Sequence, residues 1–173
     1  MGSFSKGKDE AVKWIRENFK QGATCLDVGA CNGKWYDLLG DHLVMDAVEV
    51  WQPYAKKYEL AYKYRMVFAN DIRTFRFPFY DLVIFGDVIE HMTVEEAQRV
   101  LAYASDHCTN MVVAVPFLYE QGMKNNNPYE VHLQPDLTPE LFDERYPGFV
   151  PIYMAEDYAY YVKKSETIGS NRK

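Results

Sequence analysis

The sequence predicts a doubly wound α/β fold, with helices on both faces of a mostly parallel seven-stranded sheet. Between residues 9 and 115, apolar runs typical of strands alternate five times with segments of helical periodicity. Residues 81–85 and 110–115 are apolar almost throughout, which indicates strands buried on both faces of a parallel sheet. The last two predicted strands are close enough in sequence to form an antiparallel hairpin.

Apolar periodicity and stop signals define the individual elements. Residues 9–19 carry apolar side chains at helical spacing, Gly40 follows the second helical pattern, and Pro53 lies near the first turn of the third. The predicted helices span residues 9–19, 35–39, 53–62, 94–105 and 139–146. The predicted strands span residues 24–28, 42–50, 65–69, 81–85, 110–115, 149–154 and 158–164.

Length and composition indicate one globular domain. The 173 residues fit a single domain, and 48% hydrophobic and 25% charged residues are ordinary values. We divide it into an N-terminal helix (1–22), a ligand-binding half (23–116), a loop, helix and hairpin (117–165) and a tail (166–173). A net charge of −6, without a basic cluster, makes nucleic acid an unlikely partner.

The cysteines and the N-terminal residues indicate the cellular compartment of the protein. Cys25, Cys31 and Cys108 are an odd number with neither a disulfide framework nor a metal-ligand spacing, so we predict no metal site and a reducing environment. The first residues lack the apolar core of a signal peptide, and no apolar run is long enough to span a membrane. We therefore expect a cytoplasmic protein.

A glycine-containing loop marks the expected ligand site. Residues 26–33 leave a strand and open a helix, where Gly29 and Gly33 let the backbone approach a ligand. Glu49 ends the second strand twenty residues after Gly29, a position suited to binding ribose hydroxyls. The glycines alone are equally consistent with a tight turn, but their spacing to Glu49 favours a nucleoside.

With these residues in place, the sequence resembles class I S-adenosylmethionine-dependent methyltransferases, in particular their small type 11/12-like domains. Their acidic-x-Gly-x-Gly-x-Gly motif matches Asp27–Gly33 except at Cys31, which occupies the middle glycine position. Asp71 matches the acid after the third strand, and residues 81–92 resemble the fourth strand and the following turn. The resemblance covers residues 24–116, and weakly the terminal hairpin. It implies a Rossmann-like fold, S-adenosylmethionine as cofactor and S-adenosylhomocysteine as product.

The resemblance also assigns roles to individual residues. Gly29 and Gly33, with Ala30 between them, would line the methionine part of the cofactor, and Asp27 would hold its ammonium group directly or through water. Glu49 would bind the ribose. Asp71 would accept a hydrogen bond from the adenine amino group, Ile72 would donate its backbone N–H to the ring, and Val50 or Trp51 would pack on the adenine face. Gly86 and Asp87 would face the methyl group.

Cys31 is the one departure from the motif. Its side chain narrows the gap between loop and ligand, which predicts weaker cofactor binding rather than none. A nicotinamide dinucleotide fits less well, because its Gly-x-Gly-x-x-Gly fingerprint fails at both Cys31 and Lys34.

The acceptor site is expected in the long polar segment 118–139, which is too long for an ordinary connection. A hydroxyl or ammonium acceptor must lose a proton, so we predict His132, or failing it His91, as the catalytic base. We expect a small-molecule or glycan-type acceptor methylated on oxygen or nitrogen. A non-catalytic module serving a partner protein and a methyltransferase of macromolecules are the alternatives, and a second subunit would complete an open site in a homodimer.

Overall fold

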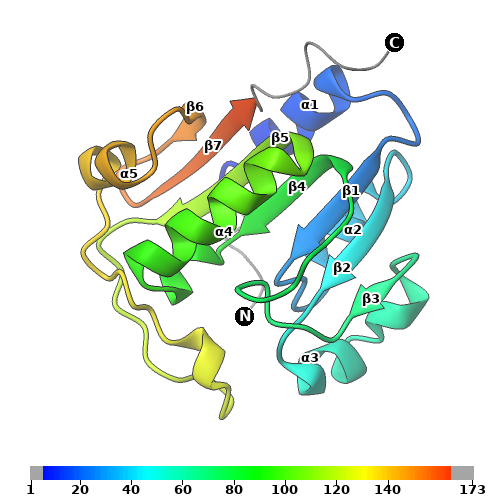
Figure 1. Cartoon of the computed structure of the whole chain (residues 1–173), viewed down its shortest axis with the longest axis horizontal. Coiled ribbons are helices and arrows are strands. Elements are labelled where there is room, and N and C mark those ends of the chain that lie inside the picture. The colour runs from blue at the N-terminus through cyan, green and yellow to red at the C-terminus, as the bar shows by residue number, and fades with distance from the viewer. Residues whose placement is uncertain (1–5, 165–173) are drawn as a thin grey trace.

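The computed structural model describes residues 6–164, so the predicted tail at 166–173 lies outside the described residues. Seven strands form one sheet in the order β3-β2-β1-β4-β5-β7-β6 (Figure 1). β1 to β5 run parallel, and β7 is antiparallel to both β5 and β6, which confirms the predicted fold class. The strands are β1 (Thr24–Val28), β2 (Val44–Val48), β3 (Val67–Phe68), β4 (Tyr80–Gly86), β5 (Cys108–Pro116), β6 (Val150–Met154) and β7 (Tyr158–Lys164).

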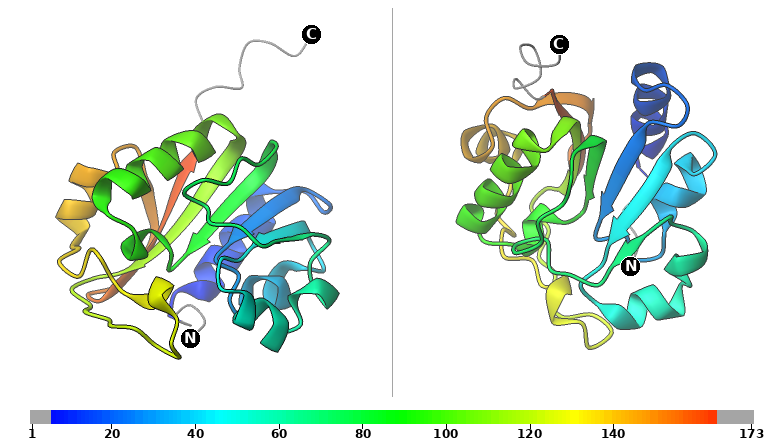
Figure 2. Two further views of the ribbon diagram at one scale, coloured as in Figure 1. Left: turned by 60° about the horizontal axis from the view of Figure 1, so that its bottom comes forward. Right: turned by 45° about the vertical axis from the view of Figure 1, so that its right-hand side comes forward.

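Helices cover both faces of the sheet, with α4 on the near face in Figure 1 and α1 and α2 on the far face, as Figure 2 also shows. The α-helices are α1 (Lys8–Asn18), α2 (Lys34–Leu39), α3 (Gln52–Lys57), α4 (Val94–Asp106) and α5 (Pro139–Arg145). The described residues also form three short 3₁₀ helices: η1 (Leu60–Tyr62), η2 (Ile89–His91) and η3 (Pro128–Glu130).

The alternation of side chains along β4 divides the core into two layers. Leu82 and Ile84 pack in one hydrophobic cluster with Ile15 of α1. Val83 and Phe85 pack in the other, which includes α4. All four β4 side chains are fully buried, as the uninterrupted apolar run predicts for a central parallel strand.

Three predicted elements are shorter than expected. The helix predicted over 53–62 ends at Lys57, because Glu59 takes a left-handed conformation (φ 52°) that turns the chain before Leu60 enters the core. β2 spans five residues, and the strand predicted over 65–69 keeps only Val67 and Phe68. β3 lies at the edge of the sheet, where its only neighbour is β2.

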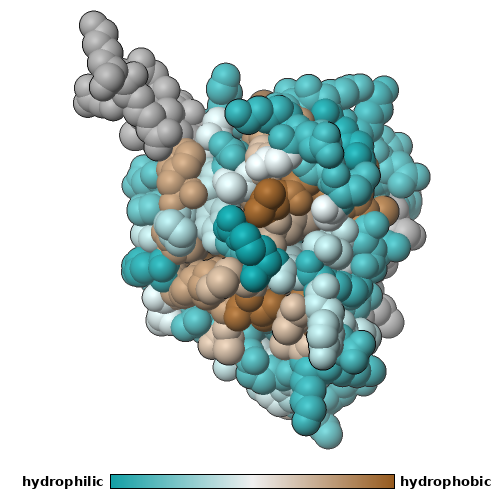
Figure 3. All heavy atoms as spheres, turned by 90° about the vertical axis from the view of Figure 1, so that its right-hand side faces the viewer, coloured by the Kyte–Doolittle hydropathy of each residue, from teal (hydrophilic) through white to brown (hydrophobic). Residues whose placement is uncertain are grey.

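The face beside this edge is shown in Figure 3, where hydrophobic side chains gather near the middle and hydrophilic ones surround them. The exposed apolar residues close to β3 in sequence are Tyr62 and Met66. Within residues 6–164, every helix is too short or too polar to cross a membrane.

Candidate functional site

A cavity lies at the carboxyl ends of β1, β2 and β4, the edge at which open α/β sheets bind ligands. Part of the long segment between β5 and α5 (yellow in Figures 1 and 2) forms another wall. Eight of the ten predicted cofactor residues line this cavity, together with both predicted catalytic histidines. The eight are Gly29, Ala30, Glu49, Val50, Asp71, Ile72, Gly86 and Asp87.

Glu49 fixes the loop after β1 to the end of β2. Its side chain is 4% exposed, and its two oxygens accept the backbone N–H groups of Cys31 and Trp51, each at 2.8 Å. Burial raises the pKa of this carboxyl, and the two N–H groups oppose that rise. Each carboxylate oxygen keeps a second lone pair, which ribose hydroxyls can use.

The loop after β1 has the backbone conformation that its glycines predict. Gly29 has φ 68°, and Cys31, at the middle glycine position, has φ 47°. A non-glycine residue is strained in this region. Burial raises the pKa of the Cys31 thiol to about 11, so the thiol is not activated for redox chemistry.

Gly86 allows β4 to pass close to Trp35 of α2. A Cβ atom at Gly86 would lie 2.5 Å from the Trp35 indole nitrogen, so any side chain there would displace the indole. The following residue, Asp87, takes φ 57° and accepts a 2.6 Å hydrogen bond from the Tyr158 hydroxyl.

Asp27 and Gly33 do not line the cavity. Asp27 is 1% exposed, its Oδ2 accepts a 2.5 Å hydrogen bond from Tyr64, and its Oδ1 has no hydrogen-bond partner among the described residues. Burial raises its pKa to about 7, although Tyr64 and Lys8 lower it. A direct contact between Asp27 and the cofactor ammonium group therefore stays a prediction.

Lys8 of α1 is a charged neighbour that the sequence analysis missed. It is 2% exposed, and its ammonium group lies 4.8 Å from the centre of the Trp35 ring. Burial lowers its pKa to about 8, while Asp87 and Asp27 raise it. Nothing in the amphipathic pattern of this helix distinguished Lys8 from a solvated lysine.

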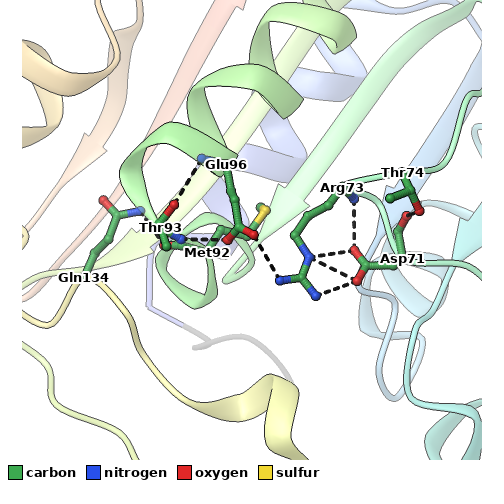
Figure 4. Close-up of polar contacts among 7 residues, drawn as sticks. All are labelled: Asp71, Arg73, Thr74, Met92, Thr93, Glu96 and Gln134. Carbon is green, nitrogen blue, oxygen red and sulfur yellow. Dashed lines mark hydrogen bonds and ion pairs between the residues drawn. The ribbon is translucent and has the colours of Figure 1, made fainter.

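Asp71 and Arg73 both line the cavity and form an ion pair (Figure 4). The guanidinium also reaches Glu96, with Nη1 3.4 Å from Oε1. Burial raises the pKa of Asp71, but the hydrogen bonds from Arg73 outweigh it and leave the pKa below its usual value. Glu96 in turn accepts from the Thr93 N–H in the capping box that begins α4, so the pair is tied to that helix.

The two predicted catalytic histidines lie next to each other. The rings of His91 and His132 are 4.7 Å apart, at an interplanar angle of 75°. Burial and the neighbouring His132 lower the pKa of His91 to about 4, and burial also lowers the pKa of His132. Glu90, which the sequence analysis did not select, is 1% exposed beside them, with His91 Nε2 4.0 Å from its Oε1.

Comparison with solved structures places this geometry in a known fold. A methyltransferase dependent on S-adenosylmethionine from Clostridium acetobutylicum matches with a TM-score of 0.69 and 12% identity, over 93% of this chain and 91% of that one. The N-terminal domain of EvdMO1, with S-adenosylhomocysteine bound, gives 0.69 and 12%, over 94% and 82%. The Burkholderia thailandensis 1,6-didemethyltoxoflavin-N1-methyltransferase, with its acceptor and S-adenosylhomocysteine bound, gives 0.61 and 13%, over 92% and 78%.

No protein-family model and no curated protein sequence matches the chain. The similarity is therefore one of structure, and it confirms that the chain has the class I methyltransferase fold.

Proposed function

We propose that this chain is a methyltransferase that transfers the methyl group of S-adenosylmethionine to an oxygen or nitrogen of a small-molecule or glycan-type acceptor. The observation that carries the proposal is the convergence of Gly29, Glu49 and Asp71 on one cavity, at the ends of β1 and β2 and beyond β3. A nucleoside needs this combination, with a glycine loop for close approach and acidic groups for its ribose and adenine.

The cofactor would extend along the strand ends. Glu49 would bind the ribose, Asp71 the adenine amino group, and Gly86 and Asp87 would lie beside the sulfonium and its methyl group. EvdMO1 and the 1,6-didemethyltoxoflavin-N1-methyltransferase carry S-adenosylhomocysteine in structures of the same fold. These bound products support S-adenosylmethionine as the cofactor of this chain.

The chemistry would be an in-line displacement. A lone pair of the acceptor attacks the methyl carbon, the carbon–sulfur bond breaks, and its electron pair stays on sulfur as the neutral thioether. The enzyme must hold the acceptor about 3–3.5 Å from the methyl carbon. His132, or failing it His91, would take the proton that the acceptor loses, because both residues line the same cavity as Gly86 and Asp87.

The proposal extends to the compartment and the oligomeric state of the protein. The three cysteines are free, which suits the reducing cytoplasm that we propose as its compartment. A homodimer would complete the acceptor side of the cavity.

A thermal-shift titration with S-adenosylmethionine, S-adenosylhomocysteine and NADH tests the proposal. A ligand that binds only the native state stabilises it by about 2.7 kcal/mol at a hundredfold excess over its dissociation constant. We expect both sulfur nucleosides to raise the melting temperature and NADH to leave it unchanged. Glu49→Gln should abolish the shift, whereas Glu17→Gln, on an exposed face of α1, should keep it.

No shift with either sulfur nucleoside would contradict cofactor binding. A shift without methyl transfer to any member of an acceptor panel would instead favour the non-catalytic module. Methylation of proteins alone in a cell extract would favour the macromolecular substrate.

A further inference from the structure

Glu90 carries a buried carboxyl group that no other residue among 6–164 satisfies. It is 1% exposed, and neither oxygen has a hydrogen-bond partner elsewhere in those residues. Burial raises the pKa of this carboxyl well above its usual value, and the negative charges of Asp87 and Glu130 add to the rise. Its position is fixed, because its carbonyl accepts the Leu133 N–H at 2.8 Å. An isolated carboxylate is too costly to bury, so the group needs a proton or a cation.

The two histidines beside Glu90 present one nitrogen each. His91 Nδ1 lies 3.2 Å from the Val131 carbonyl oxygen, and His132 Nδ1 lies 2.7 Å from that of Tyr119. A carbonyl only accepts, so each Nδ1 carries the proton and each Nε2 keeps its lone pair. Metal-binding histidines are oriented by the same second hydrogen bond.

We propose that Glu90, His91 and His132 bind one divalent transition-metal ion at the acceptor side of the cavity. One ligand atom from each residue lies within 4.8 Å of the other two. Bond lengths of about 2.1 Å place two ligands of one tetrahedral ion about 3.4 Å apart. The set must therefore close by up to about 1.4 Å, which side-chain rotation can supply.

The ligand types define the class of ion. Two imidazole nitrogens and one carboxylate suit zinc, manganese, cobalt or iron(II), whereas magnesium and calcium prefer oxygen ligands throughout. Three protein ligands also leave coordination positions open, as in catalytic metal sites. All three residues line the cavity that contains Gly86 and Asp87.

The use of the ion rests on the proposed function. An ion at this place would bind an oxygen of the acceptor and make its proton easier to lose, the usual effect of a bound cation. Where the ion is bound, His91 and His132 would act as its ligands, and the acidified acceptor would release its proton to solvent water instead of to an imidazole. The acceptor would then be an oxygen nucleophile with metal-binding character, such as a hydroxyl with a neighbouring oxygen.

Direct metal binding tests the inference without any turnover. The chain is stripped with a chelator and dialysed to equilibrium against zinc, manganese, cobalt or magnesium salts, and bound metal is measured by elemental analysis. The variants are Glu90→Gln and His132→Ala, with His42→Ala as the control, because His42 lies near Phe19, remote from the cavity. Binding of S-adenosylhomocysteine is measured on the same metal-free samples, and circular dichroism checks that each variant is folded.

We expect one equivalent of a transition metal per chain, with less magnesium. Removing a residue that hydrogen-bonds a metal ligand weakens metal affinity roughly tenfold to hundredfold. Removing a ligand itself should weaken the metal affinity at least as much. His42→Ala should bind like the wild type. The near-isosteric Glu90→Gln keeps the test valid if His132→Ala does not fold.

Two outcomes would overturn the inference. The first is substoichiometric binding of every ion. The second is an equal metal affinity in Glu90→Gln and the wild type, which would show that the Glu90 carboxyl is protonated and binds no ion. Metal binding without S-adenosylhomocysteine binding would support the metal site and contradict the proposed function. Binding of S-adenosylhomocysteine without metal binding would overturn only the metal site.

Discussion

Arg73 engages both oxygens of the Asp71 carboxylate: its Nε lies 3.0 Å from each oxygen, and its Nη2 lies 2.6 Å from Oδ2. The backbone N–H of Arg73 also donates to Oδ1 at 2.9 Å. A carboxylate has about four acceptor positions, and Arg73 uses most of them. An adenine amino group would therefore have to share Asp71 with the guanidinium or displace it.

We predict that Arg73→Met strengthens S-adenosylhomocysteine binding severalfold. The substitution leaves the Asp71 carboxylate available to the adenine amino group, and hydrogen bonds to a charged group are worth about 1.5–3 kcal/mol. Isothermal titration calorimetry measures the change. Arg76→Met is the matched control, since Arg76 stacks on Tyr103 and does not line the cavity. Weaker binding in Arg73→Met would show instead that the guanidinium holds Asp71 in its binding position.

The features that the sequence predicted well are those set by local patterns. Gly29 and Glu49 follow parallel strands, Gly86 ends one, and the carboxyl ends of such strands meet at one edge of the sheet. The strand pattern therefore located this wall of the cavity before any side-chain contact was known.

The missed features depend on contacts between distant residues. Glu90 and His132 are 42 positions apart, and no spacing rule connects them until the segment after β5 folds over η2. For this reason the sequence alone could not place Glu90 beside the two histidines. Lys8 was missed for a similar reason, because only tertiary packing buries it. The pairing of Arg73 with Asp71 could have been predicted, since an arginine two positions after an aspartate can pair with it.

The conformation of Cys31 predicts opposite effects for two substitutions. Cys31→Gly removes left-handed backbone strain of about 1–2 kcal/mol from the folded state. The glycine loses more chain entropy on folding, which costs about 0.5–1 kcal/mol, so the variant should be as stable as the wild type or slightly more stable. Cys31→Val places a β-branched residue at φ 47° and should destabilise it by at least about 1 kcal/mol. Urea unfolding measures both values. Equal stability of the glycine and valine variants would show that the loop relaxes to another conformation.

Gln134 is expected to hold the segment after β5 in place. Its amide nitrogen donates to the carbonyl oxygens of Ile89 and Met92 at 2.9 and 3.1 Å, and its Oε1 accepts from the Tyr146 hydroxyl at 2.8 Å. Figure 4 shows Gln134 beside Met92. Gln134→Leu should cost about 2–4 kcal/mol of unfolding free energy, because each buried group left unpaired costs about 1–3 kcal/mol.

Limited proteolysis should also cleave the segment before residue 134 faster in Gln134→Leu. Gln98→Leu is the control, because Gln98 also donates to a backbone carbonyl, that of Arg145, but in an exposed position. Equal cleavage rates in the two variants would mean that other contacts hold the segment.

The buried carboxyl of Asp27 predicts how stability depends on pH. Burial raises its pKa from 3.8 to about 7, so the folded protein holds this proton more tightly than the unfolded chain does. The resulting stabilisation is complete below about pH 4 and is lost as the pH rises through 7. Because one pKa unit corresponds to about 1.4 kcal/mol, the loss across this window is on the order of 4 kcal/mol.

Asp27→Asn should remove this part of the pH dependence, since the amide oxygen still accepts from Tyr64 but has no proton to lose. Lys8, with a pKa of about 8, titrates above the midpoint of this window; because the Asp27 charge helps to raise the pKa of Lys8, the comparison rests on the points at pH 4.5 and 6 as well as on that at pH 7.5. Free energies of unfolding in urea at pH 4.5, 6 and 7.5 give the slope, and Asp143→Asn, at an exposed position of α5, serves as the control. We expect the free energy of unfolding to depend less on pH only in Asp27→Asn. The stability of this variant should exceed that of the wild type most at pH 7.5. Parallel profiles would show that Asp27 is already ionised at pH 4.5, with Lys8 and Tyr64 stabilising its charge.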